Sequence, residues 1–319
     1  MQLRVLNMAD TTSCPDVFRK LEDIAEVASL PPDQDTLRRR LRDFDAYFAS
    51  LHVRADREAM ERSPRLRVIV TPSTGTDHID LDAAAERGIR VLSLKDDPEL
   101  LERITATAEL AWGLLLATVR RLPWAFAAAR AGRWARDRFR GHQLSGKTLG
   151  VLGYGRLGRM VARYGLAFGM RVLACDVRDV APENGVTMAD FDTLLRESDV
   201  LSVHVHLTDG NRGLIGAEAL AKMKPGAVLI NTSRGAIVDE SALLEALRCG
   251  RLGGAGLDVI CGEWDANLAE HPLVRHANEH EDLVITPHVG GVTFESQRMA
   301  MEHAVRKLLK FLEVPDDPQ

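Results

Sequence analysis

Short runs of β-branched and aliphatic residues alternate with amphipathic stretches along almost the whole chain. Such apolar runs are typical of buried strands, and an amphipathic stretch between two of them is typical of a helix. Strands that alternate with helices form βαβ units, whose strands pair in parallel. The pattern therefore predicts an α/β fold built from doubly wound parallel sheets.

The first third of the chain is expected to hold four strands and two helices. The predicted strands are Leu3–Asn7, Ala46–Phe48, Arg67–Val70 and Arg90–Ser93, and the predicted helices are Val17–Val27 and Leu81–Arg87. The second helix is followed by Gly88, and glycine is common just beyond a helix C terminus, which supports that boundary.

The middle of the chain opens with a predicted helix, Thr105–Thr118, and an arm from Pro123 to Gly141. The arm holds four aromatic residues, Trp124, Phe126, Trp134 and Phe139. So many exposed aromatic rings are unfavourable in water, and we expect the arm to be covered. An internal contact would cover it, and so would a homodimer interface, which is the sharper hypothesis.

From Thr148 onward, strands and helices are predicted to alternate regularly. The predicted strands are Thr148–Leu152, Arg171–Ala174, Val200–Val205, Ala227–Ile230, Gly254–Val259 and Leu283–Thr286. One amphipathic helix, Phe294–Leu312, is expected after the glycine pair at 290–291.

A glycine-rich turn lies directly between a predicted strand and a predicted helix. Its glycines are Gly153, Gly155 and Gly158, in the spacing GxGxxG. In a dinucleotide-binding unit, the first glycine permits a tight turn, the second lets the backbone approach a pyrophosphate, and the third lets the helix pack on the strand. The N terminus of that helix then favours the negative charge of the phosphates.

Asp176 lies eighteen residues beyond Gly158, at the end of the next predicted strand. A carboxylate at this point can accept hydrogen bonds from the adenosine ribose hydroxyls and would repel a 2′-phosphate. We therefore expect NAD as the cofactor. Arg178 is two residues away and keeps NADP open as the alternative.

Three successive strands are followed by chemically distinct groups. The segments are Asn231–Gly235, Asp258–Glu263 and Pro287–Gly291. Ligands of open parallel sheets bind outside the carboxyl ends of the strands, so these segments are expected to meet in one crevice. The arginine, the carboxylates and the imidazole in these segments are each compatible alone with a surface ion pair or a helix cap. Together they suit hydride transfer to a 2-keto acid.

Each group has a natural part in that reaction. Arg234 offers planar donors for a carboxylate and its adjacent carbonyl. His288 is expected to give a proton to the carbonyl oxygen, and Glu263 to favour the protonated imidazole and orient it. Asp258 is expected to hold the nicotinamide carboxamide. This chemistry needs no metal.

Composition narrows the remaining classes of function. The chain has 319 residues, enough for about two domains, with 45% hydrophobic and 27% charged residues. Its formal net charge of -5 argues against a nucleic-acid or anionic-membrane partner. The apolar stretch Ala108–Val119 is shorter than a bilayer span, and the first ten residues show no signal peptide, so we expect a cytoplasmic protein.

The cysteines and paired histidines offer alternative sites. No CxxC pair occurs among Cys14, Cys175, Cys249 and Cys261, which are expected to be reduced and mostly buried. The sharper alternative makes Cys261 a nucleophile. The pairs His204/His206 and His276/His280 have metal-ligand spacing, but we favour packing beside the cofactor for the first and a solvated loop for the second.

Several motifs closely resemble the D-isomer-specific 2-hydroxyacid dehydrogenases, over nearly the whole chain. They are Leu149–Gly158, Asn231–Gly235, Leu257–Val259, Thr286–Gly291, Thr74–Asp80 and Thr107–Leu110. The resemblance implies two Rossmann-like domains: a discontinuous substrate domain at 1–104 and 292–319, and an inserted NAD domain at 105–291. It also implies a homodimer formed through the inserted domain.

The resemblance implies site residues as well. Arg234, Glu263 and His288 match the catalytic trio, and Thr74 and Gly75 match the turn that holds the substrate carboxylate. The implied cofactor site comprises Gly153, Gly155, Arg156, Leu157, Gly158, Asp176, His206, Thr232, Asp258 and Gly290. A non-catalytic, NAD-sensing partner protein on the same scaffold is the alternative function, and turnover distinguishes the two.

Departures from the family pattern leave the substrate open. Trp264 and His206 stand where the family has prolines, and Trp264 is expected to narrow or reshape the pocket. Thr74 replaces the lysine of phosphite dehydrogenases, and Glu263 replaces the glutamine of formate dehydrogenases, which argues against both activities. The phosphate-binding arginine of phosphoglycerate dehydrogenase corresponds to His52 here, with Arg54 nearby.

Overall fold

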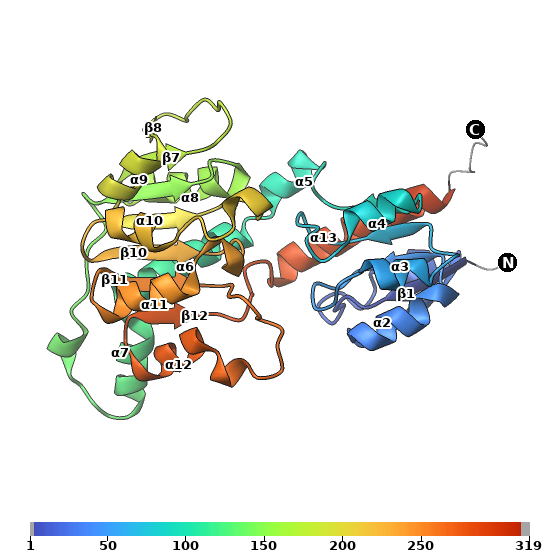
Figure 1. Cartoon of the computed structure of the whole chain (residues 1–319), viewed down its shortest axis with the longest axis horizontal. Coiled ribbons are helices and arrows are strands. Elements are labelled where there is room, and N and C mark those ends of the chain that lie inside the picture. Colours follow the sequence, from blue (N-terminus) through green and yellow to red (C-terminus); the bar gives the residue numbers. More distant parts are fainter. Residues whose placement is uncertain (1–2, 314–319) are drawn as a thin grey trace. The chain divides into compact units, whose positions relative to one another are not determined.

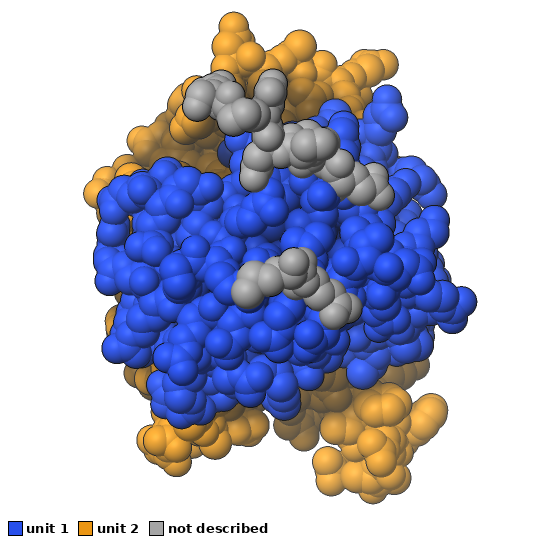
Figure 2. Space-filling view, turned by 90° about the vertical axis from the view of Figure 1, so that its right-hand side faces the viewer, with its two compact units in different colours: residues 1–104, 292–319 blue, residues 105–291 orange. Residues whose placement is uncertain are grey.

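The computed structural model describes residues 3–313, and the chain divides into two compact units (Figure 1). Unit 1 comprises residues 1–104 and 292–319, and unit 2 comprises residues 105–291. Figure 2 shows the two units in different colours. Each unit has its own parallel sheet and its own hydrophobic core.

Unit 1 contains a five-stranded parallel sheet in the order β2-β1-β3-β4-β5. The strands are β1 (Leu3–Asn7), β2 (Ala25–Ser29), β3 (Ala46–Phe48), β4 (Val68–Val70) and β5 (Arg90–Leu92). The helices are α1 (Arg19–Glu22), α2 (Gln34–Arg40), α3 (Arg57–Glu61), α4 (Leu81–Glu86), α5 (Pro98–Arg103) and α13 (Phe294–Glu313). Both faces are buried: Tyr47 joins one core cluster, while Phe48 packs in another with Leu308 of α13.

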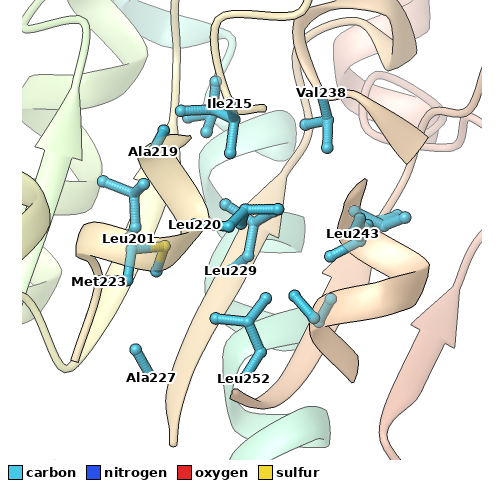
Figure 3. Close-up of a cluster of buried hydrophobic side chains, with 14 of the residues drawn as sticks. Leu201, Ile215, Ala219, Leu220, Met223, Ala227, Leu229, Val238, Leu243 and Leu252 are labelled. Atoms are coloured by element: carbon cyan, nitrogen blue, oxygen red, sulfur yellow. The ribbon is translucent and has the colours of Figure 1, made fainter. Parts of the chain in front are cut away.

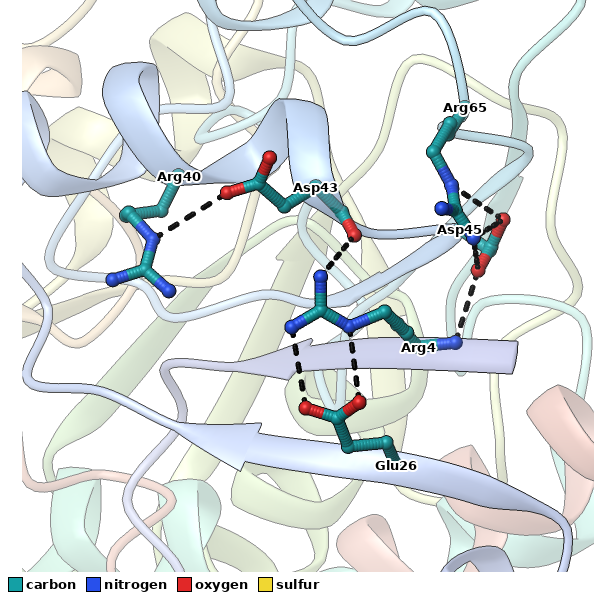
Figure 4. A network of polar contacts seen from close by, with 6 residues as sticks. All are labelled: Arg4, Glu26, Arg40, Asp43, Asp45 and Arg65. Carbon is teal, nitrogen blue, oxygen red and sulfur yellow. Dashed lines mark hydrogen bonds and ion pairs between the residues drawn. The ribbon is translucent and has the colours of Figure 1, made fainter. Parts of the chain in front are cut away.

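An ion-pair network ties the amino ends of three strands in unit 1 (Figure 4). Arg4 of β1 is the register partner of Glu26 in β2, and its guanidinium donates to both carboxylate oxygens of Glu26. The same guanidinium donates to the carbonyl of Asp43. Asp45, just before β3, accepts from the backbone N–H of Arg4 and from Arg65. These contacts hold the register of β1 between its two neighbours.

Unit 2 contains a seven-stranded parallel sheet in the order β12-β11-β10-β9-β6-β7-β8. The strands are β6 (Thr148–Leu152), β7 (Arg171–Cys175), β8 (Val186–Met188), β9 (Val200–Val203), β10 (Ala227–Asn231), β11 (Leu252–Leu257) and β12 (Leu283–Ile285). The helices are α6 (Ala106–Val119), α7 (Leu122–Arg130), α8 (Arg156–Ala167), α9 (Phe191–Glu197), α10 (Ala217–Lys222), α11 (Glu240–Arg248) and α12 (Pro272–Glu279). The strand order reverses between β6 and β9, which is where doubly wound sheets bind ligands.

Helices bury both faces of this sheet. In β10, Leu229 packs in the cluster drawn in Figure 3, among residues of α10 and α11 such as Leu220 and Leu243. Its neighbours Val228 and Ile230 point into the opposite cluster, which α6 and α8 complete. Alternate residues of a strand face opposite sides, so a continuous apolar run is what a doubly covered strand requires.

The predicted α/β class with parallel sheets is confirmed, but several elements differ from their predictions. Val17–Val27 was predicted as one helix, whereas the structure has the short α1 followed by the edge strand β2. The strand β8 and the helix α7 were not predicted. The strands β2 and β8 lie at sheet edges, where one side is partly solvated and the apolar signal is weak.

Candidate active site

The glycine-rich turn connects β6 to α8 and fits a dinucleotide. Gly153 has φ +92°, and a Cβ there would lie 2.7 Å from the carbonyl carbon of His204 beyond β9. A Cβ on Gly158 would lie 2.0 Å from the carbonyl oxygen of Gly153, so only glycine lets the helix pack on the turn. Gly155 is the N-cap of α8 and has no side-chain cap, which leaves the first N–H groups of the helix for phosphate oxygens.

Asp176 follows β7, and its carboxylate is already engaged. Arg178 donates to Oδ1 through its backbone N–H and Nε and to Oδ2 through Nη2, and the N–H of Tyr154 also donates to Oδ2. The hydrogen bond with Arg178 is the largest cause that lowers the pKa of Asp176 to about 2. The guanidinium also lies 3.6 Å from a Cβ built on Gly155. The predicted ribose contact therefore requires Arg178 to share or leave this carboxylate.

His288 and Glu263 form a close pair in unit 2. The Nδ1 atom of His288 lies 2.6 Å from Oε1 of Glu263, and each side chain is about one-fifth exposed. The other oxygen of Glu263 is buried and has no hydrogen-bond partner among residues 3–313. The charge of Glu263 is thus directed at the imidazole, and Nε2 is the nitrogen left to exchange a proton with a ligand.

Asp258 holds the backbone that carries His288. Its buried carboxylate accepts from the hydroxyl of Thr286 and from the N–H groups of Val289 and Gly290 at 2.6–2.9 Å. The N–H of His288 donates to the carbonyl of Asp258, and His288 has φ +53°, in the left-handed region. Burial raises the pKa of Asp258. The pattern of residues does not predict this clamp, and the expected contact of Asp258 with the nicotinamide carboxamide stays a prediction.

The loop after β10 carries Arg234. Asn231 is buried and braces the loop, because it donates to the carbonyl of Arg234 and accepts from the N–H of Ser233. Gly235 packs against the segment after β11, where a Cβ would lie 2.3 Å from the carbonyl carbon of Ile260. The buried hydroxyl of Thr232 has no hydrogen-bond partner in the described part of the chain, which fits its predicted contact with a cofactor.

A cavity of about 400 Å³ lies beside the His288–Glu263 pair. Apolar side chains from α12 and β12 line it, together with Pro123 and Trp124 of α7. Trp264 also lines the cavity, and its ring stacks on that of His288 with 5.8 Å between centroids and 22° between planes. Trp264 thus lies beside both the cavity and the imidazole, and its predicted effect on the shape of the pocket stays a prediction.

The remaining predicted substrate residues lie in unit 1. Thr74 and Gly75 belong to the turn after β4, where the hydroxyl of Ser73 donates to the carbonyl of Gly75. His52 and Arg54 follow β3, and Arg54 exchanges backbone hydrogen bonds with the side chain of Gln34. Substrate binding by Thr74 and Gly75 stays a prediction.

The alternative sites of the sequence receive little support. His204 bonds Ser202 through Nε2, and burial lowers the pKa of His204 to about 4. The prediction that His276 lies in a solvated loop is wrong. His276 is buried in α12, and its imidazole forms a hydrogen bond with Asp282. Cys261 is exposed, but local desolvation and the nearby Glu240 raise the pKa of its thiol to about 11, which disfavours the reactive thiolate.

Within the described ranges, no group of three or more histidine, cysteine or acidic residues is placed to hold a metal ion. Among the helices of residues 3–313, none is both long and apolar enough to cross a membrane.

Comparison with known proteins places this geometry in a family. Residues 112–290 match the family model described as "D-isomer specific 2-hydroxyacid dehydrogenase, NAD binding domain". Glyoxylate reductase from Thermococcus litoralis is 38% identical over 88% of this chain and 84% of its own length. Hydroxypyruvate reductase from Thermotoga maritima is 36% identical over 90% of this chain and 91% of its own. D-lactate dehydrogenase from Aquifex aeolicus, solved with NAD and lactic acid, is 29% identical with a TM-score of 0.80, covering 97% of this chain and 95% of that one.

Proposed function

The chain belongs to the D-isomer specific 2-hydroxyacid dehydrogenase family, and we propose that it works mainly as a reductase of small 2-keto acids. In this proposal His288 donates the proton, Glu263 orients and charges the imidazole, and Arg234 binds the substrate carboxylate. The 2.6 Å contact between His288 and Glu263 carries the assignment, because an imidazole held by a carboxylate at Nδ1 is a competent acid and base at Nε2.

Family membership confirms the predicted enzyme class and cofactor. The protein is an oxidoreductase that acts on the CH–OH group of a 2-hydroxy acid, and NAD is its cofactor. The matched model is that of the NAD-binding domain, and it spans the glycine-rich turn and both His288 and Glu263.

The residues of unit 2 account for the proton and the charge in the proposed reaction. NADH, when bound, supplies the hydride that reduces the carbonyl carbon. As the carbonyl becomes an alkoxide, protonated His288 transfers the proton on Nε2 to the oxygen and becomes neutral. Glu263 stabilises the protonated imidazole before this transfer. Arg234 would pair with the carboxylate in a bidentate contact and fix which carbon faces the hydride.

The names of the two enzyme relatives suggest the size of the substrate. They act on glyoxylate and hydroxypyruvate, which both carry a carboxylate beside a carbonyl, with only a hydrogen atom or a hydroxymethyl group on the other side of the carbonyl. We propose the same class here, with the exact side chain open. We also propose a homodimer and a cytoplasmic location.

The test follows NADH oxidation with a series of 2-keto acids, from glyoxylate to phosphorylated and bulky ones. Turnover of short 2-keto acids is expected. Arg234→Lys serves as the matched variant, because it keeps the positive charge but loses the planar pair of guanidinium donors. The rate of keto-acid reduction should therefore fall while NADH binding persists. Absence of turnover with every 2-keto acid, in protein that binds NADH, would overturn the proposal in favour of a binding role.

A further inference from the structure

One tight turn presents two neighbouring side chains to His288. Gly262 has φ +67°, and the N–H of Asp265 donates to its carbonyl at 2.9 Å. Glu263 and Trp264 are the two central residues of this turn. Glu263 reaches the Nδ1 edge of the imidazole, and the ring of Trp264 lies in offset, nearly parallel stacking beside the same ring. The imidazole is therefore restrained in its plane by the carboxylate and out of its plane by the indole.

The stacking geometry gives Trp264 an electrostatic effect as well. The ring centroids are 5.8 Å apart, within the range of about 6 Å over which an aromatic face attracts a cation. Tryptophan has the strongest such face, and it attracts an imidazolium more than a neutral imidazole. The indole is 48% exposed, so water screens part of this attraction.

We propose that Trp264 is a positioning residue for His288, which holds the imidazole in line with Glu263 and favours its protonated form. The inference rests on the proposed function, in which His288 is the proton donor. Its consequence is that reductase activity persists to a higher pH than Glu263 alone would allow.

The other groups that face His288 differ from Trp264 in how they act. The carboxylate of Glu263 bonds its Nδ1 atom, and the carboxylate of Asp258 interacts with it through space from the end of β11. Both carboxylates stay in place when Trp264 is replaced. A change in the pH profile of reductase kcat on replacement of Trp264 would therefore arise from loss of the indole and not from loss of a carboxylate.

A purely steric part for Trp264 predicts a different result. If the indole only limits the space for the substrate side chain, a smaller residue at position 264 should change KM by an amount that depends on substrate size. The same substitution should leave the pH profile of kcat unchanged. The two explanations are separable with one set of variants.

The variants are Trp264→Phe, which keeps a smaller aromatic face, and Trp264→Leu, which keeps apolar volume and removes the face. The pH at which reductase kcat falls to half is expected to move down by about half a unit in Trp264→Leu and by less in Trp264→Phe. NADH binding checks that each variant is folded. An unchanged profile in both variants would overturn the proposal.

A second readout does not depend on turnover. An imidazolium quenches the fluorescence of an indole that it touches, so emission of the unmodified protein should drop as His288 gains its proton. This step should vanish in Trp264→Phe and in His288→Asn, where asparagine tolerates the left-handed backbone. A step that survives in Trp264→Phe would also overturn the proposal. If His288→Asn keeps full reductase activity, the proposed function is wrong. The fluorescence change of the unmodified protein still tests separately whether Trp264 contacts His288.

Discussion

The contact between His288 and Glu263 fixes the expected direction of the pH dependence. A carboxylate at 2.6 Å stabilises the imidazolium, which is the form that would donate a proton in the proposed reduction. Glu263→Gln keeps the size of the side chain and removes its charge. The pH above which reductase kcat falls should therefore move to lower pH, by about one unit or more. Steady-state rates across the pH range measure this shift.

His288→Ala is the companion variant, and it should lose most activity at every pH. In the proposed mechanism, oxidation of the hydroxy acid would use neutral imidazole as the base, so its pH dependence should be opposite to that of reduction. If the profile of Glu263→Gln matched that of the unmodified protein, Glu263 would not be the partner of His288. Asp258 would then be the next candidate.

Asp176 leads to a prediction about cofactor choice. Its pKa is lowered to about 2, chiefly by the hydrogen bond with Arg178, so the carboxylate stays ionised as the pH falls until about that value. Titration of Asp176 should thus add no pH dependence to the preference for NAD over NADP above about pH 5. Any change near pH 6 would come from the 2′-phosphate of NADP, whose second pKa is about 6. Asp176→Ala should narrow the preference, since it removes the charge that opposes a 2′-phosphate. Values of kcat/KM for both cofactors measure it.

Arg178 is the residue that can reverse this expectation. Its guanidinium pairs with Asp176 and lies beside Gly155, where a 2′-phosphate would find a cation. Equal kcat/KM for NAD and NADP in the unmodified protein would show that Arg178 outweighs Asp176. In that case Arg178→Ala should restore the preference for NAD.

The strands were predictable to the extent that both faces of each are buried. In β10 and β6 every residue is buried, and the apolar run is unmistakable. The edge strand β2 has the sequence AEVAS, in which only Ala25 is buried and Glu26 interrupts the apolar run, and its pattern predicts part of a helix instead. Strand ends and glycines also predicted His288 and Glu263, which lie 2.6 Å apart in the structure, whereas the part of Arg234 in the same site stays a prediction. The left-handed backbone at His288 was not predictable from local residues, since it depends on contacts of Asp258 with residues about thirty positions further along the chain.

The loop that follows β12, from Thr286 to Gly290, leads to a prediction about stability. Asp258→Ala would leave the N–H groups of Val289 and Gly290 and the hydroxyl of Thr286 without their acceptor. The free energy of unfolding should fall by about 2–4 kcal/mol, and reductase kcat should fall as His288 loses its support. Asp258→Asn keeps one acceptor oxygen and should lose less. Urea unfolding measures the first effect, and unaltered stability in Asp258→Ala would contradict the clamp.

At the scale of the whole molecule, the aromatic arm remains the feature that one chain does not explain. It begins as α7, on which Leu122 and Phe126 are four residues apart and therefore on one face. Their exposed fractions are 50% and 65%, and that of Trp134 in the same arm is 88%. Exposed aromatic and aliphatic side chains gathered on one segment are typical of a protein interface.

We therefore expect a homodimer with twofold symmetry through this arm, as the family resemblance also implies. Phe126→Asp places a charge in the apolar face and should yield a monomer, which light scattering at micromolar concentration measures. Leu81→Asp is the matched control, since Leu81 is 48% exposed on α4 of unit 1 and an acidic residue suits the first turn of a helix. That variant should stay dimeric. A monomeric mass for the unmodified protein would contradict the interface, and a dimer that persists in Phe126→Asp would move it away from α7.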